Sequence, residues 1–246
     1  MANTLFLRLE GPLQSWGERA KWDMRDTALE PTKSGVVGLL ACALGWNTDE
    51  ALRSLSQQIR VGVRCDRPGS MLVDYHTIVS GIMSEGKIKR NAKGEPETSI
   101  SQRAYLCDAS FLVAVQAEPE LIDRLAWAIQ DPFWTLYLGR KSCPPSCPPY
   151  EGTGEYLNLA MALADWPWYQ WNVDPHTVQS RAVLEHPTPT GMRRRDEIYA
   201  RSRRVYGARY VNEIPVTVKV HPIDLLGLEN LTSLESPGGE PCTSLA

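Results

Sequence analysis

Residues 31–46 constrain the fold of this chain more than any other stretch. They can form a helix that begins at Thr32 or Ser34, because either hydroxyl can cap its first turn. Almost all residues from 36 to 44 are apolar, so this helix has no polar face. The sequence therefore predicts a helix at the centre of a hydrophobic core, covered by other elements on all sides.

The start of this helix also has a functional interpretation. Lys33 supplies a cation, Ser34 a hydroxyl, and Gly35 a position that another backbone can approach closely. Because the amides at a helix start attract negative charge, this turn suits a phosphate group. Ordinary capping of a core helix accounts for the same residues, and both interpretations stay open.

The order of the elements predicts an α+β fold. Apolar alternation predicts strands at 4–9, 59–65, 109–116 and 134–138. Helical spacing and capping signals predict helices at 31–46 and 119–129, with a short helix between them that starts at a capping box of Asn47 and Glu50. Over residues 1–149 this is the order of an RRM-like or ferredoxin-like βαββαβ domain. Such a domain leaves one face of its antiparallel sheet open, which is a common platform for single-stranded RNA.

A polar excursion, at about residues 75–105, interrupts this pattern after the second strand. It contains glycines and few apolar residues, and its positive charge is concentrated at Lys87, Lys89 and Arg90, with Arg103 near its end. A solvated loop would have this composition. The excursion is therefore expected to leave the core.

The C-terminal third, residues 150–223, is predicted to form a smaller β-rich extension with strands at 177–184 and 216–220. Between these strands, seven arginines in residues 193–209 are interleaved with tyrosines. Arginine guanidinium groups bind phosphates and tyrosine rings stack on bases, so RNA is the expected ligand of this run. A solvated arginine-rich surface is the alternative. Residues 224–246 are expected to be a disordered tail.

Composition narrows the classes of protein further. A net charge of −3 does not suit a protein that coats nucleic acid non-specifically, so an RNA surface must be a local basic patch. No apolar run approaches the roughly 18 residues of a membrane span. Six scattered cysteines suit reduced thiols in a cytoplasmic protein. Cys143 and Cys147 have no second pair of zinc ligands, so neither a metal nor a cofactor is expected.

Six short motifs follow one another through the first 148 residues. They are GPLQSWG at 11–17, RDT at 25–27, PTKSG at 31–35, DYHT at 74–77, RAYLCDA at 103–109 and YLGRKSCP at 137–144. In this order they resemble the CasD family, a group of subunits of the type I-E CRISPR Cascade complex. Beyond residue 149 the resemblance is looser and consists mainly of the arginine-rich run.

This resemblance implies an RNA-binding subunit of the RAMP superfamily that does not cleave RNA. The excursion would be a β-hairpin thumb inserted into an RRM-like domain, and the body would bind and cap the 5′ handle of the crRNA. The implied partners are the crRNA, the backbone subunit of the CasC family, the large subunit of the CasA family and, through the assembled antiviral complex, target DNA.

The resemblance also implies roles for individual residues. Lys33, Ser34 and Gly35 would bind a handle phosphate at the helix start. Arg140, Lys141 and Ser142 would do the same after the fourth strand. Gln14, Ser15 and Trp16 would line the pocket, with Trp16 either stacking on a base or filling the core. Further RNA-binding residues are expected at the RDT motif, in the thumb and in the arginine-rich run: Arg25, Lys87, Lys89, Arg90, Arg103, Arg194, Arg195 and Arg204.

The alternative function is a metal-independent endoribonuclease that processes precursor crRNA, as type I-C relatives do. Such an enzyme needs a base, an acid and a cation, and His76, Tyr75 and Lys141 supply these residue types. An unrelated enzyme of small-molecule metabolism is the least supported class, because the sequence shows no nucleophile–base pair and no cofactor motif.

Overall fold

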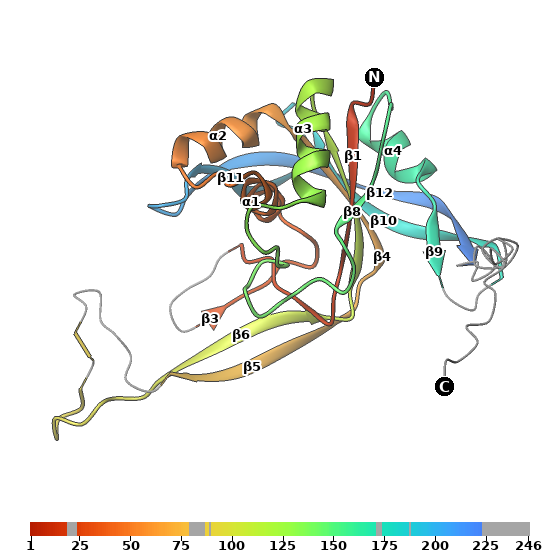
Figure 1. The fold of residues 1–246 in the computed structure, drawn as a ribbon. Coiled ribbons are helices and arrows are strands. Elements are labelled where there is room, and N and C mark those ends of the chain that lie inside the picture. Colours follow the sequence, from red (N-terminus) through yellow and green to blue (C-terminus); the bar gives the residue numbers. More distant parts are fainter. Residues whose placement is uncertain (19–23, 79–86, 89, 171–173, 187, 223–246) are drawn as a thin grey trace, which may run out of the picture.

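The computed structural model describes residues 1–18, 24–78, 87–88, 90–170, 174–186 and 188–222. These residues form the expected mixture of helices and strands, with a curled sheet at the centre (Figure 1). Their helices are α1 (Lys33–Leu44), α2 (Asp49–Gln58), α3 (Pro119–Gln130) and α4 (Leu159–Asp165). Within the described ranges, no helix is long and apolar enough to cross a membrane. The tail expected at 224–246 lies outside these ranges.

The larger sheet contains strands from both ends of the chain. Its strands are β1 (Thr4–Glu10), β4 (Arg60–Arg67), β7 (Ser110–Gln116), β8 (Tyr150–Gly154), β9 (Trp168–Gln170), β10 (His176–His186), β11 (Met192–Ala200) and β12 (Val205–Pro222). Their order is β11-β12-β10-β4-β7-β1-β8, with β9 pairing in parallel with β12 and the other neighbours antiparallel. Because β10 pairs with β4, the C-terminal strands continue the sheet that the N-terminal strands begin.

The fourth predicted strand, 134–138, is wrong. These residues form an irregular loop, and β8 takes the place beside β1. Leu136 and Leu138 are both buried, which produces a strand-like alternation without a strand. The loop is held instead by two backbone hydrogen bonds around Leu138, whose amide donates to Cys143 O at 2.7 Å and whose carbonyl accepts from Ser15 N at 3.0 Å.

The two faces of the larger sheet are both covered in its central part. Leu5 and Leu7 of β1 face the core that contains the buried residues of α1 and α3. Phe6 points to the opposite face, where it packs in a second core with Leu163 of α4 and stacks on Trp166 at 4.0 Å between ring centroids. The expected open platform for RNA is therefore absent from these central strands, because α4 and the segment that follows it cover that face.

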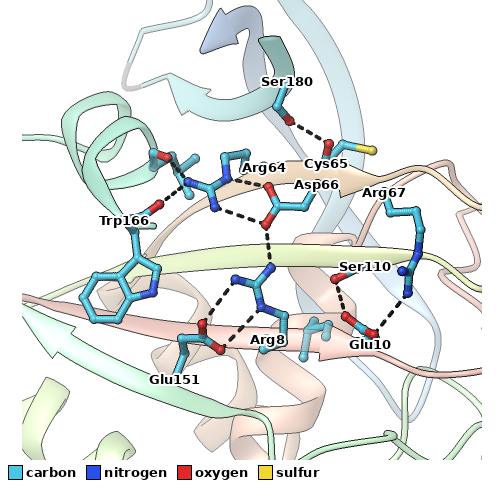
Figure 2. A network of polar contacts seen from close by, with 12 residues as sticks. Arg8, Glu10, Arg64, Cys65, Asp66, Arg67, Ser110, Glu151, Trp166 and Ser180 are labelled. Atoms are coloured by element: carbon cyan, nitrogen blue, oxygen red, sulfur yellow. Dashed lines mark hydrogen bonds and ion pairs between the residues drawn. The ribbon is translucent and has the colours of Figure 1, made fainter. Parts of the chain in front are cut away.

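Beside Phe6, the same face carries a buried ionic network (Figure 2). Arg64, which is fully buried, donates to both carboxylate oxygens of Asp66 and to the carbonyls of Leu163 and Trp166. Arg8 donates to Asp66 at 2.5 Å and forms an ion pair with Glu151 at 3.2 Å. Burial tends to lower the pKa of Arg8, but the two carboxylates outweigh burial and raise it. The network thus joins β1, β4, β8 and α4 through buried arginines whose charges are neutralised by carboxylates.

Helix α1 is buried as predicted, and contacts at both of its ends hold it in place. Thr32 caps it by accepting a hydrogen bond from Gly35 N at 3.2 Å. Trp16 packs against Gly35 so closely that a Cβ there would lie 2.7 Å from the indole ring. At the other end, Gly45 adopts the left-handed conformation and lies against Phe133. Helix α2 begins one residue later than expected, with Thr48 as its cap instead of Asn47.

The smaller sheet contains β2 (Leu13–Gln14), β3 (Met24–Arg25), β5 (Ser70–Ile78) and β6 (Ser99–Cys107). Strands β5 and β6 pair from Ser70↔Cys107 to Ile78↔Ser99 and reach away from the body (Figure 1). The polar excursion therefore leaves the core, as expected. Its flanks are paired strands, and the solvated-loop interpretation does not hold for them.

The predicted C-terminal strands are present but longer. Residues 177–184 lie within β10, and residues 216–220 lie within the long strand β12. The arginine-rich run forms most of β11, a turn at 201–204 and the start of β12, which together make an antiparallel hairpin. No pattern in the sequence predicted this hairpin.

Candidate nucleic-acid interface

A groove of about 920 Å³ lies between α1, two loops and the β11–β12 hairpin. Its lining brings together Ser15 and Trp16, Ser34 and Gly35, and Lys141, which come from three of the predicted motifs. The hairpin adds Ile198, Arg201 and Tyr206, and further aromatic side chains come from Trp46, Trp134 and Tyr137. The groove therefore combines cationic groups with aromatic rings, the two features that bind single-stranded RNA.

The GPLQSWG motif builds the floor of this groove rather than an exposed contact surface. Gln14 is fully buried and donates to Leu9 O at 3.0 Å and Ala109 O at 2.8 Å, while its own carbonyl accepts from Trp16 Nε1 at 3.0 Å. Ser15 donates to Ala104 O at 3.2 Å. Trp16 is only 1% exposed, so of its two expected roles the structure supports filling the core.

Lys33, a predicted phosphate ligand, forms ion pairs within the protein through its side chain. Its side chain is 2% exposed, and its ammonium lies 2.7 Å from Glu185 and 3.8 Å from Glu197. Its backbone amide, at the start of α1, donates to Asp196 Oδ2 at 2.8 Å. The helix start does bind an anion, as its chemistry predicts, but that anion is a carboxylate of the protein itself. The Lys33 ammonium is therefore already paired with carboxylates of the protein, and its contact with an RNA phosphate stays a prediction.

Next to the groove lies an arginine cluster, defined here as Arg25, Arg103, Arg140 and Arg204. Burial, followed by the charges of the other three arginines, lowers the pKa of Arg25. The Arg140 guanidinium lies over the ring of Tyr105 at 4.5 Å and donates to Arg25 O at 3.2 Å. Arg25 Nε and Arg140 Nη1 are buried and have no hydrogen-bond partner among the described residues. Buried donors of this kind are costly unless a ligand satisfies them.

The loop at 139–142 connects this cluster to the groove. Arg140 belongs to the cluster, and the neighbouring Lys141 is exposed and lines the groove. Ser142 is also exposed, with its hydroxyl 3.9 Å from Cys143 Sγ. Gly139 has a positive φ of 88°, which favours glycine. A Cβ there would overlap Ser15 O, so this loop packs directly against the backbone of the GPLQSWG motif.

The arginine-rich run divides into structural and surface residues. Arg194 pairs with Glu30 at 2.7 Å and Glu18 at 3.6 Å. Arg209 pairs with Asp196 at 2.7 Å, so these two guanidinium groups are already neutralised. Arg195 is exposed. Arg204 belongs to the arginine cluster, and Arg201, which was not among the predicted site residues, lines the groove; the hairpin places both near the other motifs.

The cationic residues of the excursion lie elsewhere. Lys87 and Arg90 are exposed beyond the ends of β5 and β6, and the Arg90 guanidinium donates to Gly94 O at 2.6 Å. Lys89 lies outside the described residues. The lining of the groove includes neither Lys87 nor Arg90. Arg103, in the middle of β6, joins the arginine cluster.

The residues of the nuclease alternative are not brought together in the groove. Tyr75 and His76 are neighbours on β5, and His76 Nδ1 lies 3.7 Å from Asp74 Oδ2. Neither residue lines the groove that contains Lys141.

Four of the thiols are shifted by burial toward their neutral form. Burial raises the pKa of Cys42, Cys65, Cys143 and Cys147, and each of them is a free cysteine. Among the described residues, no group of three or more His, Cys, Asp or Glu side chains is arranged to hold a metal ion.

Known proteins with this architecture define its class. The family model described as CRISPR-associated protein (Cas5) matches residues 4–212, and the chain belongs to this family. Among individual relatives, the CRISPR system Cascade subunit CasD of Escherichia coli strain K12 is 37% identical over 179 residues, which cover 68% of this chain and 78% of that protein.

Two solved structures agree with this assignment. A chain of a CRISPR RNA-guided surveillance complex is 31% identical, with a TM-score of 0.71 and coverage of 93% of this chain and 98% of that chain. A Cas protein studied by crystallography is 37% identical, with a TM-score of 0.63 and coverage of 87% and 94%.

Proposed function

We propose that this chain is a crRNA-binding subunit of a type I-E Cascade complex and that it binds and caps the 5′ handle of the crRNA. One observation carries the proposal: the groove and the adjoining arginine cluster gather cationic side chains from β3, β6, the 139–142 loop and the β11–β12 turn. The family membership and the RNA-guided complex to which a similar structure belongs support the same function.

The chemistry of this surface fits a single RNA strand. Buried donors on Arg25 and Arg140 suit phosphate oxygens, which accept several hydrogen bonds at once. The rings of Trp134, Tyr137 and Tyr206 line the groove beside them and can stack on unpaired bases. An RNA strand that follows the arginines would therefore place its bases against the aromatic lining. The net charge of −3 makes such a local patch the main attraction for RNA.

The arrangement of the strands supports the rest of the assignment. The order β4-β7-β1-β8, with α1 and α3 in the connections, is compatible with an RRM-like domain. We assign the β5–β6 pair as the thumb that contacts the CasC-type backbone subunit. Met71, Val73 and Tyr75 are exposed along β5, as apolar residues are at protein interfaces. The body would adjoin the CasA-type large subunit and meet target DNA only through the complex.

We propose that the subunit binds RNA without cleaving it. General acid–base catalysis requires its base and acid within hydrogen-bond reach of the reacting atoms. Tyr75 and His76 lie on β5, whereas the proposed RNA path runs through the groove, so this pair does not face the bound strand along that path.

Two experiments test the proposed function. In a filter-binding assay, the purified protein should bind RNA that carries the repeat-derived 5′ handle more tightly than RNA with a scrambled handle; equal affinities would contradict handle recognition. Incubation with precursor crRNA in EDTA should leave the RNA intact. Site-specific cutting that His76→Ala abolishes would establish the nuclease alternative.

The thumb assignment has its own test. Deleting residues 84–97 should leave a folded body, judged by circular dichroism, but reduce co-purification with the backbone subunit. A complete complex containing the deletion variant would contradict this assignment.

A further inference from the structure

The turn between β11 and β12 carries three arginines that would repel one another. Arg201, Arg203 and Arg204 lie at 201–204, where the Arg204 amide donates to Arg201 O at 3.1 Å. Arg204 has a positive φ of 54°, which is uncommon for a residue with a side chain. A turn of this composition needs an external contact to keep a single conformation.

Helix α2 supplies that contact. Asp49, its first residue, accepts a hydrogen bond from Ser202 N at 2.9 Å and a second, short one from the Ser202 hydroxyl. These two hydrogen bonds are the main reason that the pKa of Asp49 is lowered. One carboxylate therefore binds both the backbone and the side chain of the residue at the centre of the turn.

With Ser202 fixed, the arginines of the turn extend in different directions. Arg201 lines the groove, where its charge acts on the Cys42 thiol. Arg204 lies close enough to Arg25 for its charge to contribute to the lowered pKa of that group. The turn thus contributes one arginine to the groove and another to the arginine cluster, and Asp49 sets the position of both.

We propose that Asp49 and Ser202 are positioning residues for RNA binding, which hold the arginine-bearing turn in the conformation that the crRNA meets. The inference rests on the proposed function, but the contact itself can be tested without RNA. Holding the turn in place before binding reduces the conformational entropy that RNA binding would otherwise cost.

The direction in which Asp49→Ala changes the affinity for RNA separates positioning from simple electrostatics. Asp49 is a negative charge beside an RNA surface, so electrostatics alone predicts that Asp49→Ala increases the affinity for RNA. Positioning predicts the opposite result, because the turn loses its anchor. Glu50→Ala is the matched control: Glu50 is the next residue of α2 and has the same charge, but it makes no contact with Ser202.

The first experiment uses the full chain without RNA. Brief trypsin digestion followed by mass spectrometry measures cleavage after Arg201, Arg203 and Arg204. Asp49→Ala should raise the cleavage rate at these sites about tenfold, since proteolysis follows the population of the open turn. Glu50→Ala should leave the rate unchanged, and both variants should keep the melting temperature of the parent. Equal cleavage in Asp49→Ala and the parent would overturn the proposal.

The second experiment measures binding of a fluorescein-labelled crRNA that carries the 5′ handle. Asp49→Ala should weaken binding about tenfold and Ser202→Ala about threefold, while the salt dependence stays the same because no phosphate contact is removed. Tighter binding by Asp49→Ala, or a freely cleaved turn with unchanged affinity, would refute positioning. If the parent protein itself does not bind this RNA, the proposed function fails, while the trypsin result still decides whether Asp49 anchors the turn.

Discussion

Two groups of arginines in this molecule have opposite environments. Arg8 and Arg64, on the face of the sheet beneath α4, are buried with Asp66 and Glu151, and their donors point at carboxylates (Figure 2). Arg25 and Arg140, beside the groove, lie near other arginines, and each has a buried nitrogen atom that finds no hydrogen-bond partner in the part of the chain that the structure describes. We call an arginine compensated when it is paired with a carboxylate and uncompensated when it is not. Compensated arginines stabilise the fold, whereas uncompensated arginines provide a surface for a negatively charged ligand.

The largest expected effect comes from removing a compensated arginine. Arg64→Ala should lower the free energy of unfolding by about 3–5 kcal/mol, because it leaves the buried Asp66 with Arg8 as its one remaining arginine and deprives the carbonyls of Leu163 and Trp166 of their donor. Urea unfolding monitored by circular dichroism measures this change. Arg67→Ala is the control, since Arg67 forms an exposed ion pair with Glu10 at 3.1 Å and should cost at most about 1 kcal/mol. Equal losses of unfolding free energy in the two variants would show that the buried network stabilises the fold no more than the exposed ion pair does.

Lys33 extends the comparison to a residue that the sequence predicts to bind RNA but that the structure pairs with two carboxylates. Lys33→Met should lower the free energy of unfolding by about 2 kcal/mol, because Glu185 loses a nearly buried partner. The salt dependence of RNA binding should not change, because the Lys33 ammonium faces carboxylates. A shallower salt dependence of RNA binding in this variant would show that Lys33 contacts an RNA phosphate.

An uncompensated arginine should behave in the opposite way. Arg140→Ala should weaken binding of handle RNA about tenfold, which corresponds to about 1.4 kcal/mol. The slope of log affinity against log salt should decrease by about one phosphate contact. The free energy of unfolding in urea should change by less than about 1 kcal/mol, because Arg140 forms no ion pair with a carboxylate among the described residues. A large stability loss with unchanged RNA affinity would show that Arg140 is structural.

The smallest expected effect is a pH dependence at the start of α1. Burial tends to raise the pKa of Asp196, but Arg209, the Lys33 amide and Arg194 lower it below its usual value. A lowered pKa in the folded state contributes stability that is complete above the unfolded pKa of about 3.9 and is lost as the pH falls through the folded pKa. The difference in unfolding free energy between the parent and Asp196→Asn should therefore be constant from neutral pH to about pH 5 and shrink below about pH 4. A difference that grows on acidification would contradict this sign.

Local patterns in the sequence predicted the central elements well. Helix α1, helix α3 and strands β1, β4 and β7 have strong periodicity or a continuous apolar composition, so their own residues define them. Strand β8 was missed because its sequence, YEGTG, contains two glycines and has no apolar alternation. The loop at 134–138 was taken for a strand because two buried leucines alternate with exposed residues.

The roles of charged residues were harder to predict because their partners are distant in sequence. The hydrogen bond between Lys33 N and Asp196 joins residues 163 positions apart, and Lys33 Nζ meets Glu185 after 152 positions. No local pattern could show that the cation at the helix start faces two acids. The motifs did indicate the groove, since Ser15, Ser34 and Lys141 all line it.

The antiparallel contact between β4 and β10 has a consequence for how the chain can be divided. Arg181↔Cys65 through Leu184↔Gly62 link residues on either side of the boundary at 149, so a fragment ending there would expose the hydrogen-bonding edge of β4 from Gly62 to Cys65. Such a fragment would also lose the residues that cover Phe6 and Leu112. Expressed alone, the N-terminal part should therefore self-associate through this uncovered edge instead of forming a stable monomer.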